Sequence, residues 1–599
     1  MIRLPAIFSK GMVLTKEAKI WGWAEPKAQI SLSFMGKQYQ ATANHEGRFE
    51  AILISEHYGG PHCLTVGDIV IQDVYIGHVW LCGGQSNMEQ PISRTRPLLK
   101  DYVKENPNIR AFQPEKGMGF SGPNQDLAGS WKTATADFLE DIFAVPYFFA
   151  QELLTSYPAP IGLINIAVGG TPAEAWLPEE IVRTFPGMYE RLEPYKQPDY
   201  ISNVDKANTT RIDKWHSNLA THDKGLSEDW HHQDYDDSSW NESMLLDKAN
   251  RPSYGAIWYR KDIFLPENIT GPWALTLGQV VDSVKVFVNG EPVAAVDYQY
   301  PPCRGNIPEG LLKPGKNTIA IRGIGSSNKH HFTPGKTYEL SSANTRINLL
   351  GPWKWRTGHE APTTEPGIWH YHVPCCVYNY MLAPVLGYSL DGIIWYQGES
   401  NTGNPQGYKA LFEAFVHHIR EHFGNVPVIF TQLANYIAFG GTGENWAQLR
   451  DQQKQCLSIP NTAMAVAIDC GEWNDLHPQD KKTVGERLAL CARGLAYGEE
   501  IAISGPMAKE ATAQDGEITI SFDHGEGLWA INGRPVVEII DEAGATYHFY
   551  GEIVGETLTA KIGEVSPKIV RFGWMDCPTV VLYNAHGLPA SPFMLPVEK

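Results

Sequence analysis

Several almost entirely apolar segments of this chain each end in glycine or glutamine, and a pattern of this kind allows few folds. Residues 79–82 and 160–168 are each followed by Gly-Gly, and residues 392–396 by Gln-Gly. An amphipathic helix is predicted from about Gly407 to Phe423, before the apolar residues 426–433. Apolar strands that alternate with helices predict an α/β fold with a parallel sheet covered on both faces. In such sheets the ligand site lies at the carboxyl ends of the strands.

The regions on either side of these segments, and one region between them, have a β pattern instead. Residues 29–34 alternate apolar and polar side chains before a turn at Met35 and Gly36. Asn289–Gly290 and Asn532–Gly533 are the residue pairs preferred in hairpin turns. The predicted organisation has five parts: an N-terminal β-sandwich at 1–75, the first part of an α/β core at 76–223, an inserted β jelly roll at 224–356, the second part of the core at 357–505, and a C-terminal β domain at 506–599.

The composition excludes several classes of protein. The 599 residues include 49 Lys and Arg against 67 Asp and Glu, a net charge of −18 that disfavours binding to nucleic acid or to anionic membranes. No apolar run approaches the roughly 20 residues of a membrane span, and the first residues lack the apolar core of a signal peptide. The nine cysteines form no C-x-x-C pair. We therefore expect reduced thiols and a cytoplasmic protein.

Ser86 is the first candidate for chemistry. It follows the apolar strand and the pair Gly83–Gly84, which permits a tight turn that exposes the hydroxyl at the sheet edge. Its own N–H could then face a developing oxyanion. Met88 stands where a G-x-S-x-G nucleophile elbow would have its second glycine, so an ordinary loop serine is the alternative interpretation.

Asp475 and His477 strengthen the catalytic interpretation. Pro478 favours an extended conformation at His477, in which residues two apart project to the same side. Asp475 could then bind Nδ1 of the imidazole and leave Nε2 free to accept a proton from a serine. The alternative is a surface Asp–His pair in a capped loop.

Two further strand ends offer donors for an oxyanion. Gly169 and Gly170 can present an unobstructed backbone N–H, and Gln397 carries an amide. Ionised Glu399 only accepts hydrogen bonds, so we expect it to support its loop. The alternative interpretation of the two glycines is a plain turn.

Histidines and carboxylates also raise the question of a metal. His370 and His372 would share one strand face, and Asp469, Glu472 and Asp475 lie near His477 in the sequence. No single segment supplies three ligands, and no H-E-x-x-H motif occurs. A phosphate-binding loop ending in Lys-Ser/Thr is also absent from the sequence. We predict no metal and no cofactor.

Four sequence blocks together resemble a known family. Residues 84–88 (Gly-Gln-Ser-Asn-Met), 169–176 (Gly-Gly-Thr-Pro-Ala-Glu-Ala-Trp), 395–401 (Trp-Tyr-Gln-Gly-Glu-Ser-Asn) and 475–478 (Asp-Leu-His-Pro) are similar to the blocks of the sialate O-acetylesterase family. This family belongs to the SGNH-type hydrolases, whose α/β core is flavodoxin-like. Residues 235–240 and 257–261 resemble the galactose-binding-like jelly roll of some bacterial members and of certain glycosidases.

The resemblance implies a role for individual residues. Ser86 would be the nucleophile, His477 the general base and Asp475 its orienting acid. Gly169, Gly170 and Gln397 would join Ser86 in stabilising the oxyanion. Further residues of the same blocks are predicted to line the substrate site: Gln85, Asn87, Trp176, Glu399 and Asn401.

The implied function is removal of O-acetyl groups from carbohydrates by a Ser-His-Asp acyl-enzyme mechanism. Acetylated plant glycan oligosaccharides of the xylan or xyloglucan type are an alternative substrate to acetylated sialic acids. A non-catalytic glycan-binding protein and a lipase or thioesterase are the alternatives from other classes. An O-acetylated oligosaccharide is the expected partner. A homodimer is compatible with the sequence, which does not determine the oligomeric state.

Overall fold

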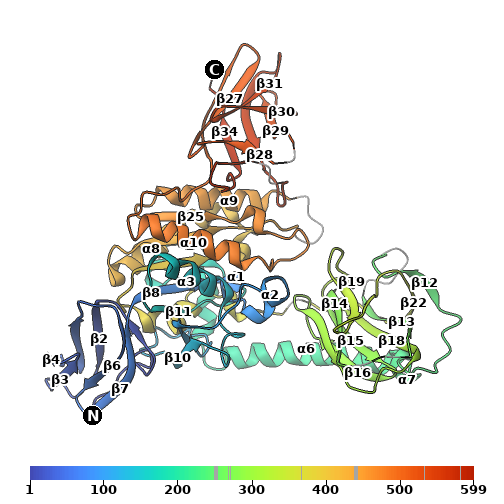
Figure 1. Ribbon diagram of the computed structural model, residues 1–599, viewed down its shortest axis with the longest axis horizontal. Coiled ribbons are helices and arrows are strands. Elements are labelled where there is room, and N and C mark those ends of the chain that lie inside the picture. Colours follow the sequence, from blue (N-terminus) through green and yellow to red (C-terminus); the bar gives the residue numbers. More distant parts are fainter. Residues whose placement is uncertain are drawn as a thin grey trace. The chain divides into compact units, whose positions relative to one another are not determined.

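The computed structural model describes residues 1–247, 254–267, 269, 271–365, 367–437, 443–531, 533–579 and 582–598. Asn532, predicted to lie in a hairpin turn, is outside these ranges. The chain divides into two compact units, one made of Met1–Gln197 and Trp369–Lys599 and the other of Pro198–Ile368. Figure 1 shows the elements of both units. Among the described residues, no helix is both long and apolar enough to cross a membrane.

The centre of the first unit is a seven-stranded sheet, which confirms the predicted parallel sheet. Its order is β10-β9-β11-β8-β23-β24-β25, and every adjacent pair is parallel except β10 with β9. The strands are β8 (His78–Gly84), β9 (Asn106–Pro114), β10 (Gly129–Ala134), β11 (Ile161–Asn165), β23 (Gly392–Tyr396), β24 (Val428–Gln432) and β25 (Thr462–Val466). β8, β11, β23 and β24 are buried along their whole length, as expected for strands covered on both faces.

Two tryptophans show which helices cover which face of this sheet. Trp80 in β8 contacts Phe149 in α3 (Ala144–Ser156), with ring centroids 4.9 Å apart. Trp395 in β23 contacts Phe415 in α8 (Tyr408–Phe423) at 4.5 Å. Trp395 is in register with Gly83, three residues beyond Trp80. Because side chains alternate along a strand, the two indoles point to opposite faces. α3 and α8 therefore cover opposite sides of the sheet.

The helices of this core pack in pairs, α3 with α10 and α8 with α9 (Figure 1). The α-helices of the first unit are α1 (Ser86–Glu89), α2 (Ile92–Leu99), α3 (Ala144–Ser156), α4 (Glu179–Val182), α5 (Tyr189–Leu192), α8 (Tyr408–Phe423), α9 (Asn445–Gln455) and α10 (Lys481–Leu495). The helix predicted before Gly424 is confirmed, and Gly424 ends it with a φ of 77°.

The same unit holds the N-terminal and C-terminal β regions. The N-terminal sheets are β1-β7-β6-β3-β4 and β2-β5, and the C-terminal sheets are β26-β27-β31-β30-β29-β32-β34 and β28-β33. The N-terminal strands are β1 (Val13–Leu14), β2 (Glu17–Trp23), β3 (Gln29–Phe34), β4 (Lys37–Thr42), β5 (Arg48–Ile54), β6 (Gly59–Val66) and β7 (Ile69–Ile76). The C-terminal strands are β26 (Met507–Gln514), β27 (Glu517–Asp523), β28 (Trp529–Ala530), β29 (Val536–Asp541), β30 (Thr546–Val554), β31 (Thr557–Lys561), β32 (Pro567–Phe572), β33 (Leu582–Tyr583) and β34 (Phe593–Pro596). The nine cysteines, all within the described ranges, are free thiols.

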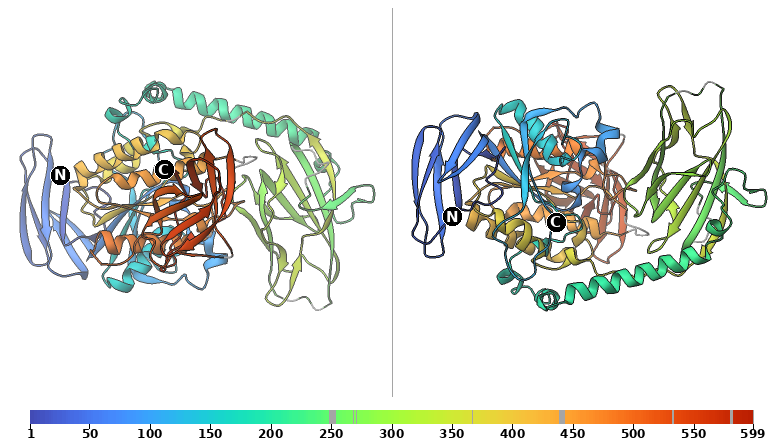
Figure 2. Two further views of the ribbon diagram at one scale, coloured as in Figure 1. Left: turned by 90° about the horizontal axis from the view of Figure 1, so that it is seen from above. Right: turned by 90° about the horizontal axis from the view of Figure 1, so that it is seen from below.

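The second unit begins with the long helix α6 (Tyr200–His222), the extended teal helix in Figure 2. Two sheets follow, β12-β22-β13-β18-β15-β16 and β17-β14-β20-β21, the latter with β19 beside β14, and their inner faces share one apolar core. The strands are β12 (Asn241–Met244), β13 (Gly255–Leu265), β14 (Trp273–Val281), β15 (Ser283–Val288), β16 (Glu291–Val296), β17 (Pro302–Ile307), β18 (Gly315–Gly325), β19 (His331–Phe332), β20 (Tyr338–Ser341), β21 (Arg346–Asn348) and β22 (Pro352–Glu360). Asn289 and Gly290 join β15 to β16 with φ values of 50° and 91°, which confirms the predicted hairpin turn.

Candidate active site

Ser86 lies where β8 turns sharply into α1. Gly84 precedes this turn with a φ of 126°, and a Cβ at that position would lie 2.1 Å from the carbonyl oxygen of Tyr396. The backbones of β8 and β23 therefore approach so closely that only glycine fits. Gln85 continues in an extended conformation, and Ser86 begins α1. The turn thus places the serine at the carboxyl edge of the sheet.

His477 reaches this serine from the loop between β25 and α10. Its Nε2 lies 2.8 Å from Oγ of Ser86, a hydrogen-bonding distance between residues 391 positions apart in the chain. Asp475 accepts a hydrogen bond from the backbone N–H of His477 at 2.9 Å. Asp475 is 3% exposed and His477 is 6% exposed. The structure therefore brings all three predicted residues together. The hydrogen bond between Asp475 and His477 involves the main chain of His477.

A buried polar network lies beside this pair, and Asn87 is at its centre. The Asn87 amide nitrogen donates to the carboxylate of Glu399 and to the carbonyl oxygen of Leu476, the latter at 3.1 Å. Its oxygen accepts from Nζ of Lys481, which is 1% exposed. Asn87 thus joins the serine turn to the Glu399 loop and to the His477 loop. Sequence reasoning missed Lys481, because nothing in its sequence surroundings marks a lysine that packs inside the protein.

Burial shifts the pKa values of His477, Lys481 and Glu399 toward the neutral form. Burial lowers the pKa of His477 to about 3, and the positive charges of Lys481 and Arg94 act in the same direction. Burial also lowers the pKa of Lys481 to about 8, opposed by Glu399 and Asp475. The pKa of Glu399 is raised by burial, against the hydrogen bond from Asn87. At neutral pH His477 is consequently a neutral imidazole, the form that can accept a proton.

Gly169 lies directly against the serine. A Cβ on Gly169 would be 3.4 Å from Cβ of Ser86. The Gly169 N–H donates to the carboxylate of Glu89, which also forms an ion pair with Lys116. The predicted oxyanion donor is therefore occupied by a carboxylate in this structure. Sequence reasoning missed Glu89 and Lys116, although Glu89 is only one turn of α1 away from Ser86.

Gln397 and two predicted substrate residues form an internal network. Gln397 is fully buried, and its amide nitrogen donates to Asn401 at 2.7 Å and to Gln85 and the Thr171 carbonyl at 3.2 Å. The Asn401 amide in turn donates to Glu174 at 3.0 Å. A bond from Gln397 to an oxyanion would have to replace one of these internal bonds.

Trp176 lies in the same region but does not reach the surface. Its side chain has no exposed area, its Nε1 donates to the Thr171 hydroxyl at 3.0 Å, and its ring packs edge-on against Trp395 at 5.2 Å. The predicted contact with substrate is thereby corrected to a packing role behind the site. The physical reason is that the apolar indole is more stable in the space between the 171 loop and β23 than in water.

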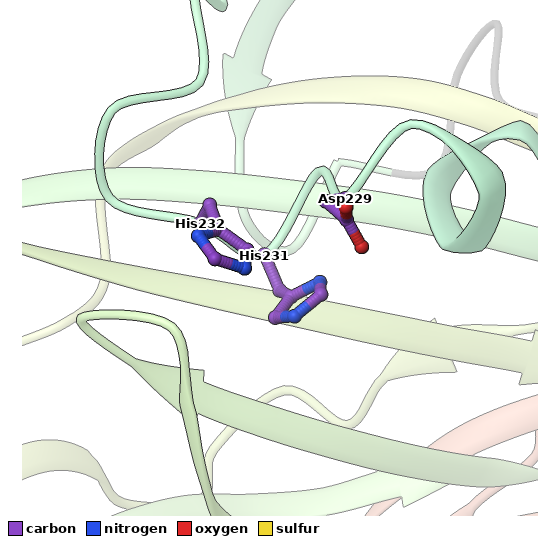
Figure 3. Close-up of side chains that lie close together, drawn as sticks. All are labelled: Asp229, His231 and His232. Carbon is purple, nitrogen blue, oxygen red and sulfur yellow. The ribbon is translucent and has the colours of Figure 1, made fainter.

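Two groups of histidines and carboxylates have ligand atoms close enough to hold a metal ion, among the residues that the structure describes: Asp229, His231 and His232, and His418, Glu421 and His422. The first group lies on one loop of the second unit (Figure 3). Burial lowers the pKa of His231, and the positive charges of Lys285 and Arg260 act in the same direction and would also oppose a bound cation. Neither group includes His370, His372 or the acids near His477.

Comparison with known proteins places this site in a family. The family model for carbohydrate esterases described as sialic acid-specific acetylesterases matches residues 76–212 and 376–492, which include Ser86 and His477. Sialate O-acetylesterase of Mus musculus is 33% identical over 574 aligned residues, covering 87% of this chain and 79% of the relative. The Homo sapiens sialate O-acetylesterase is 32% identical over 573 residues, covering 87% and 76%.

The same fold occurs in a solved structure. The crystal structure of a carbohydrate acetylesterase from Xanthomonas citri aligns over 99% of both chains with a TM-score of 0.66 and 24% identity. The sequence relatives extend through most of the chain, and the family model covers both parts of the chain that form the Ser86 site. This chain is an esterase and belongs to the sialate O-acetylesterase family.

Proposed function

We propose that the protein removes O-acetyl groups from sugars by serine-based acyl transfer on an SGNH-type core. The observation that carries this proposal is the 2.8 Å separation of Ser86 Oγ and His477 Nε2. A hydroxyl at this distance from a neutral imidazole can transfer its proton as it attacks an ester carbonyl. The burial that keeps His477 neutral supports its role as general base.

The reaction would proceed in two steps. Ser86 attacks the acetyl carbonyl, His477 takes the serine proton, and the same proton then goes to the sugar oxygen as the ester bond breaks. Water, activated by His477, attacks the acetyl-enzyme, and acetate leaves as the hydroxyl of Ser86 is restored. Asp475 would act as a positioning residue, because its bond to the His477 backbone holds the loop that carries the imidazole.

Stabilisation of the oxyanion is assigned to backbone donors. The N–H of Ser86 belongs to the first turn of α1, where helical N–H groups have no partner within the helix. Gly170 follows Gly169 with a φ of 76°. We propose Ser86 and Gly170 as donors, and Gly169 whenever Glu89 releases its N–H. One such donor contributes roughly 3–4 kcal/mol to lowering the barrier.

An O-acetylated sialic acid is the substrate that the family name suggests. Arg94 lies close enough to His477 to lower its pKa, so an anionic sugar would meet a positive charge at this site. Neutral acetylated xylan or xyloglucan oligosaccharides are the alternative substrates. Acetate release from O-acetylated sialic acids and from acetylated xylo- and xyloglucan oligosaccharides, compared at equal concentration, distinguishes the two classes.

Replacement of the serine tests the mechanism itself. Ser86→Ala is expected to lower kcat/KM for p-nitrophenyl acetate by about 10⁴-fold or more, because it removes the nucleophile. Ser93→Ala changes an exposed serine of α2 and should leave the rate unchanged. Full turnover by folded Ser86→Ala would refute the assignment.

The remaining expectations from the sequence are part of this proposal. They are the division at 76–223, 224–356 and 357–505, a cytoplasmic location and a homodimer. Limited proteolysis, cell fractionation and gel filtration test them in that order.

A further inference from the structure

Trp369 is unusually exposed for a tryptophan of this chain. It is 55% exposed, whereas Trp80, Trp176 and Trp395 of the surrounding α/β core are 2% exposed or less. Trp473 and Trp529 are the other tryptophans with two fifths or more of their surface in water. A large apolar ring held in water costs free energy unless a ligand covers it.

The position of Trp369 connects it with the reacting serine. A Cβ on Gly170 would lie 3.1 Å from Nε1 of Trp369, and a Cβ on the preceding Gly169 would lie 3.4 Å from Cβ of Ser86. Since adjacent Cα atoms are about 3.8 Å apart, this path from the indole to the serine is on the order of 10 Å long. The path is an upper bound on the separation of the two side chains, so a substrate with an acetyl group and one pyranose ring is long enough to reach both.

The segment that carries the indole is anchored by several hydrogen bonds within the first unit. The carbonyl oxygen of Trp369 accepts from the His372 N–H at 3.0 Å, and Arg191 donates to the carbonyl oxygen of His372. The His370 ring lies 3.1 Å from the Tyr195 hydroxyl. The Trp369 ring also contacts Tyr371 at 5.8 Å. These bonds hold the backbone, so the ring needs little ordering before it binds a ligand.

A second contact joins this segment to the same glycine. The His372 side chain hydrogen-bonds the backbone of Gly170. The indole and the imidazole therefore both meet the loop that lies against Ser86.

We propose that Trp369 forms a sugar-stacking subsite in which its indole packs against a pyranose ring of the O-acetylated substrate. The C–H groups on one face of a pyranose form a flat apolar surface that suits an indole. The inference depends on the proposed function only for the identity of the reacting position, Ser86. It adds the residue that binds the sugar and predicts that small acyl esters do not use it.

The kinetic test compares an acetylated oligosaccharide with p-nitrophenyl acetate, a small ester that carries no sugar. Trp369→Ala is expected to raise KM for an acetylated oligosaccharide about 10-fold, with kcat/KM for p-nitrophenyl acetate within twofold of wild type. Trp369→Phe, which keeps an aromatic face, should recover most of the affinity. Trp529→Ala, at an exposed tryptophan of the C-terminal β region, is the matched control and should change neither substrate. An unchanged oligosaccharide KM, or an equal loss on both substrates, would overturn the subsite.

A binding measurement makes the test independent of turnover. Calorimetry with Ser86→Ala and with Ser86→Ala/Trp369→Ala uses two probes, O-acetylated sialyllactose and acetylated xylotriose. The subsite predicts that the probe bound by the single variant loses about 10-fold in affinity in the double variant. Which probe binds distinguishes an anionic from a neutral sugar. Equal affinity of both variants contradicts the subsite, whereas activity of Ser86→Ala contradicts only the proposed mechanism.

Discussion

Two buried polar networks of this protein differ in whether their pKa shifts favour the charged or the neutral form of the buried groups. In the second unit, the carboxylate of Asp282 accepts bonds of 2.8–2.9 Å from the backbone N–H groups of Ser326, Ser327 and Asn328 and from the side chains of Ser326 and Asn328. Burial alone would raise the pKa of Asp282, but the bonds from Asn328 and Ser326 lower it overall. The ionised form of the Asp282 carboxylate is therefore stabilised inside the second unit.

The Ser86 site has the opposite balance. For His477, Lys481 and Glu399, burial is the largest cause of the pKa shift and moves each group toward its neutral form. Hydrogen bonds that saturate an ion produce a rigid structural element. Burial that hydrogen bonds do not offset leaves groups with strongly shifted pKa values, and such groups cluster at functional sites. We expect such a difference between a structural network and the proposed catalytic one.

The largest effect on stability is expected at Asp282. Asp282→Ala leaves several buried N–H donors without their acceptor and should lower the free energy of unfolding of the second unit by about 3–5 kcal/mol. Urea denaturation followed by fluorescence measures this loss. Asp297→Ala, at an exposed aspartate of the same unit, should stay within about 0.5 kcal/mol of wild type. Equal stability of the two variants would show that the hydrogen bonds of Asp282 do not stabilise the second unit.

Lys481→Met is expected to affect catalysis more than folding. It removes the donor to Asn87 and a positive charge that lowers the pKa of His477. Displacement of the serine turn should reduce kcat for p-nitrophenyl acetate about 10- to 100-fold. The acid limb of the pH–rate profile should also move to higher pH. Lys482→Met removes an i,i+4 ion pair with Glu486 and a cation–π contact with Tyr102. It is the adjacent control and is expected to change neither quantity.

The pH dependence of the wild-type enzyme tests whether burial lowers the pKa of His477. With the pKa of His477 lowered to about 3, the imidazole stays neutral well below the 6.5 of an ordinary histidine, so kcat/KM should change less than about twofold between pH 8 and pH 5. The unfolded chain takes up this proton first, so the histidine reduces stability as the pH falls from 6.5 toward 3. Half-maximal activity near pH 6.5 would show that burial does not lower the pKa of His477.

The smallest effect is expected from chelation. The proposed acyl transfer between Ser86, His477 and water requires no metal ion, so incubation with EDTA followed by dialysis should leave the esterase rate unchanged. Loss of activity that zinc restores would contradict the serine mechanism.

Much of the fold and part of the site could be predicted because the signals are local. Gly84 indicated a tight turn after β8, and the structure gives the reason in the approach of the Tyr396 carbonyl. The apolar stripe before Gly424 predicted α8 correctly. Trp176 shows the limit of such reasoning, because a tryptophan in a block near the site can bind substrate or fill the core, and only its surroundings decide.

The residues that sequence reasoning missed depend on contacts between distant loops. Lys481 resembles any lysine at the start of a helix until Asn87, nearly 400 positions earlier, is placed against its Nζ. Glu89 and Trp369 become relevant only because both meet the Gly169–Gly170 loop. Sequence periodicity does not indicate contacts between residues of distant loops.

The sequence by itself determined the alternation of apolar strands and helices, the tight turns and the chemical types available at the strand ends, because these depend on near neighbours in the chain. Only the tertiary structure decided which groups meet and how each one ionises. A pKa and a hydrogen-bonding distance depend on burial and on charges from distant segments, and those are defined only after the loops of β8, β11, β23 and β25 pack at one edge of the sheet.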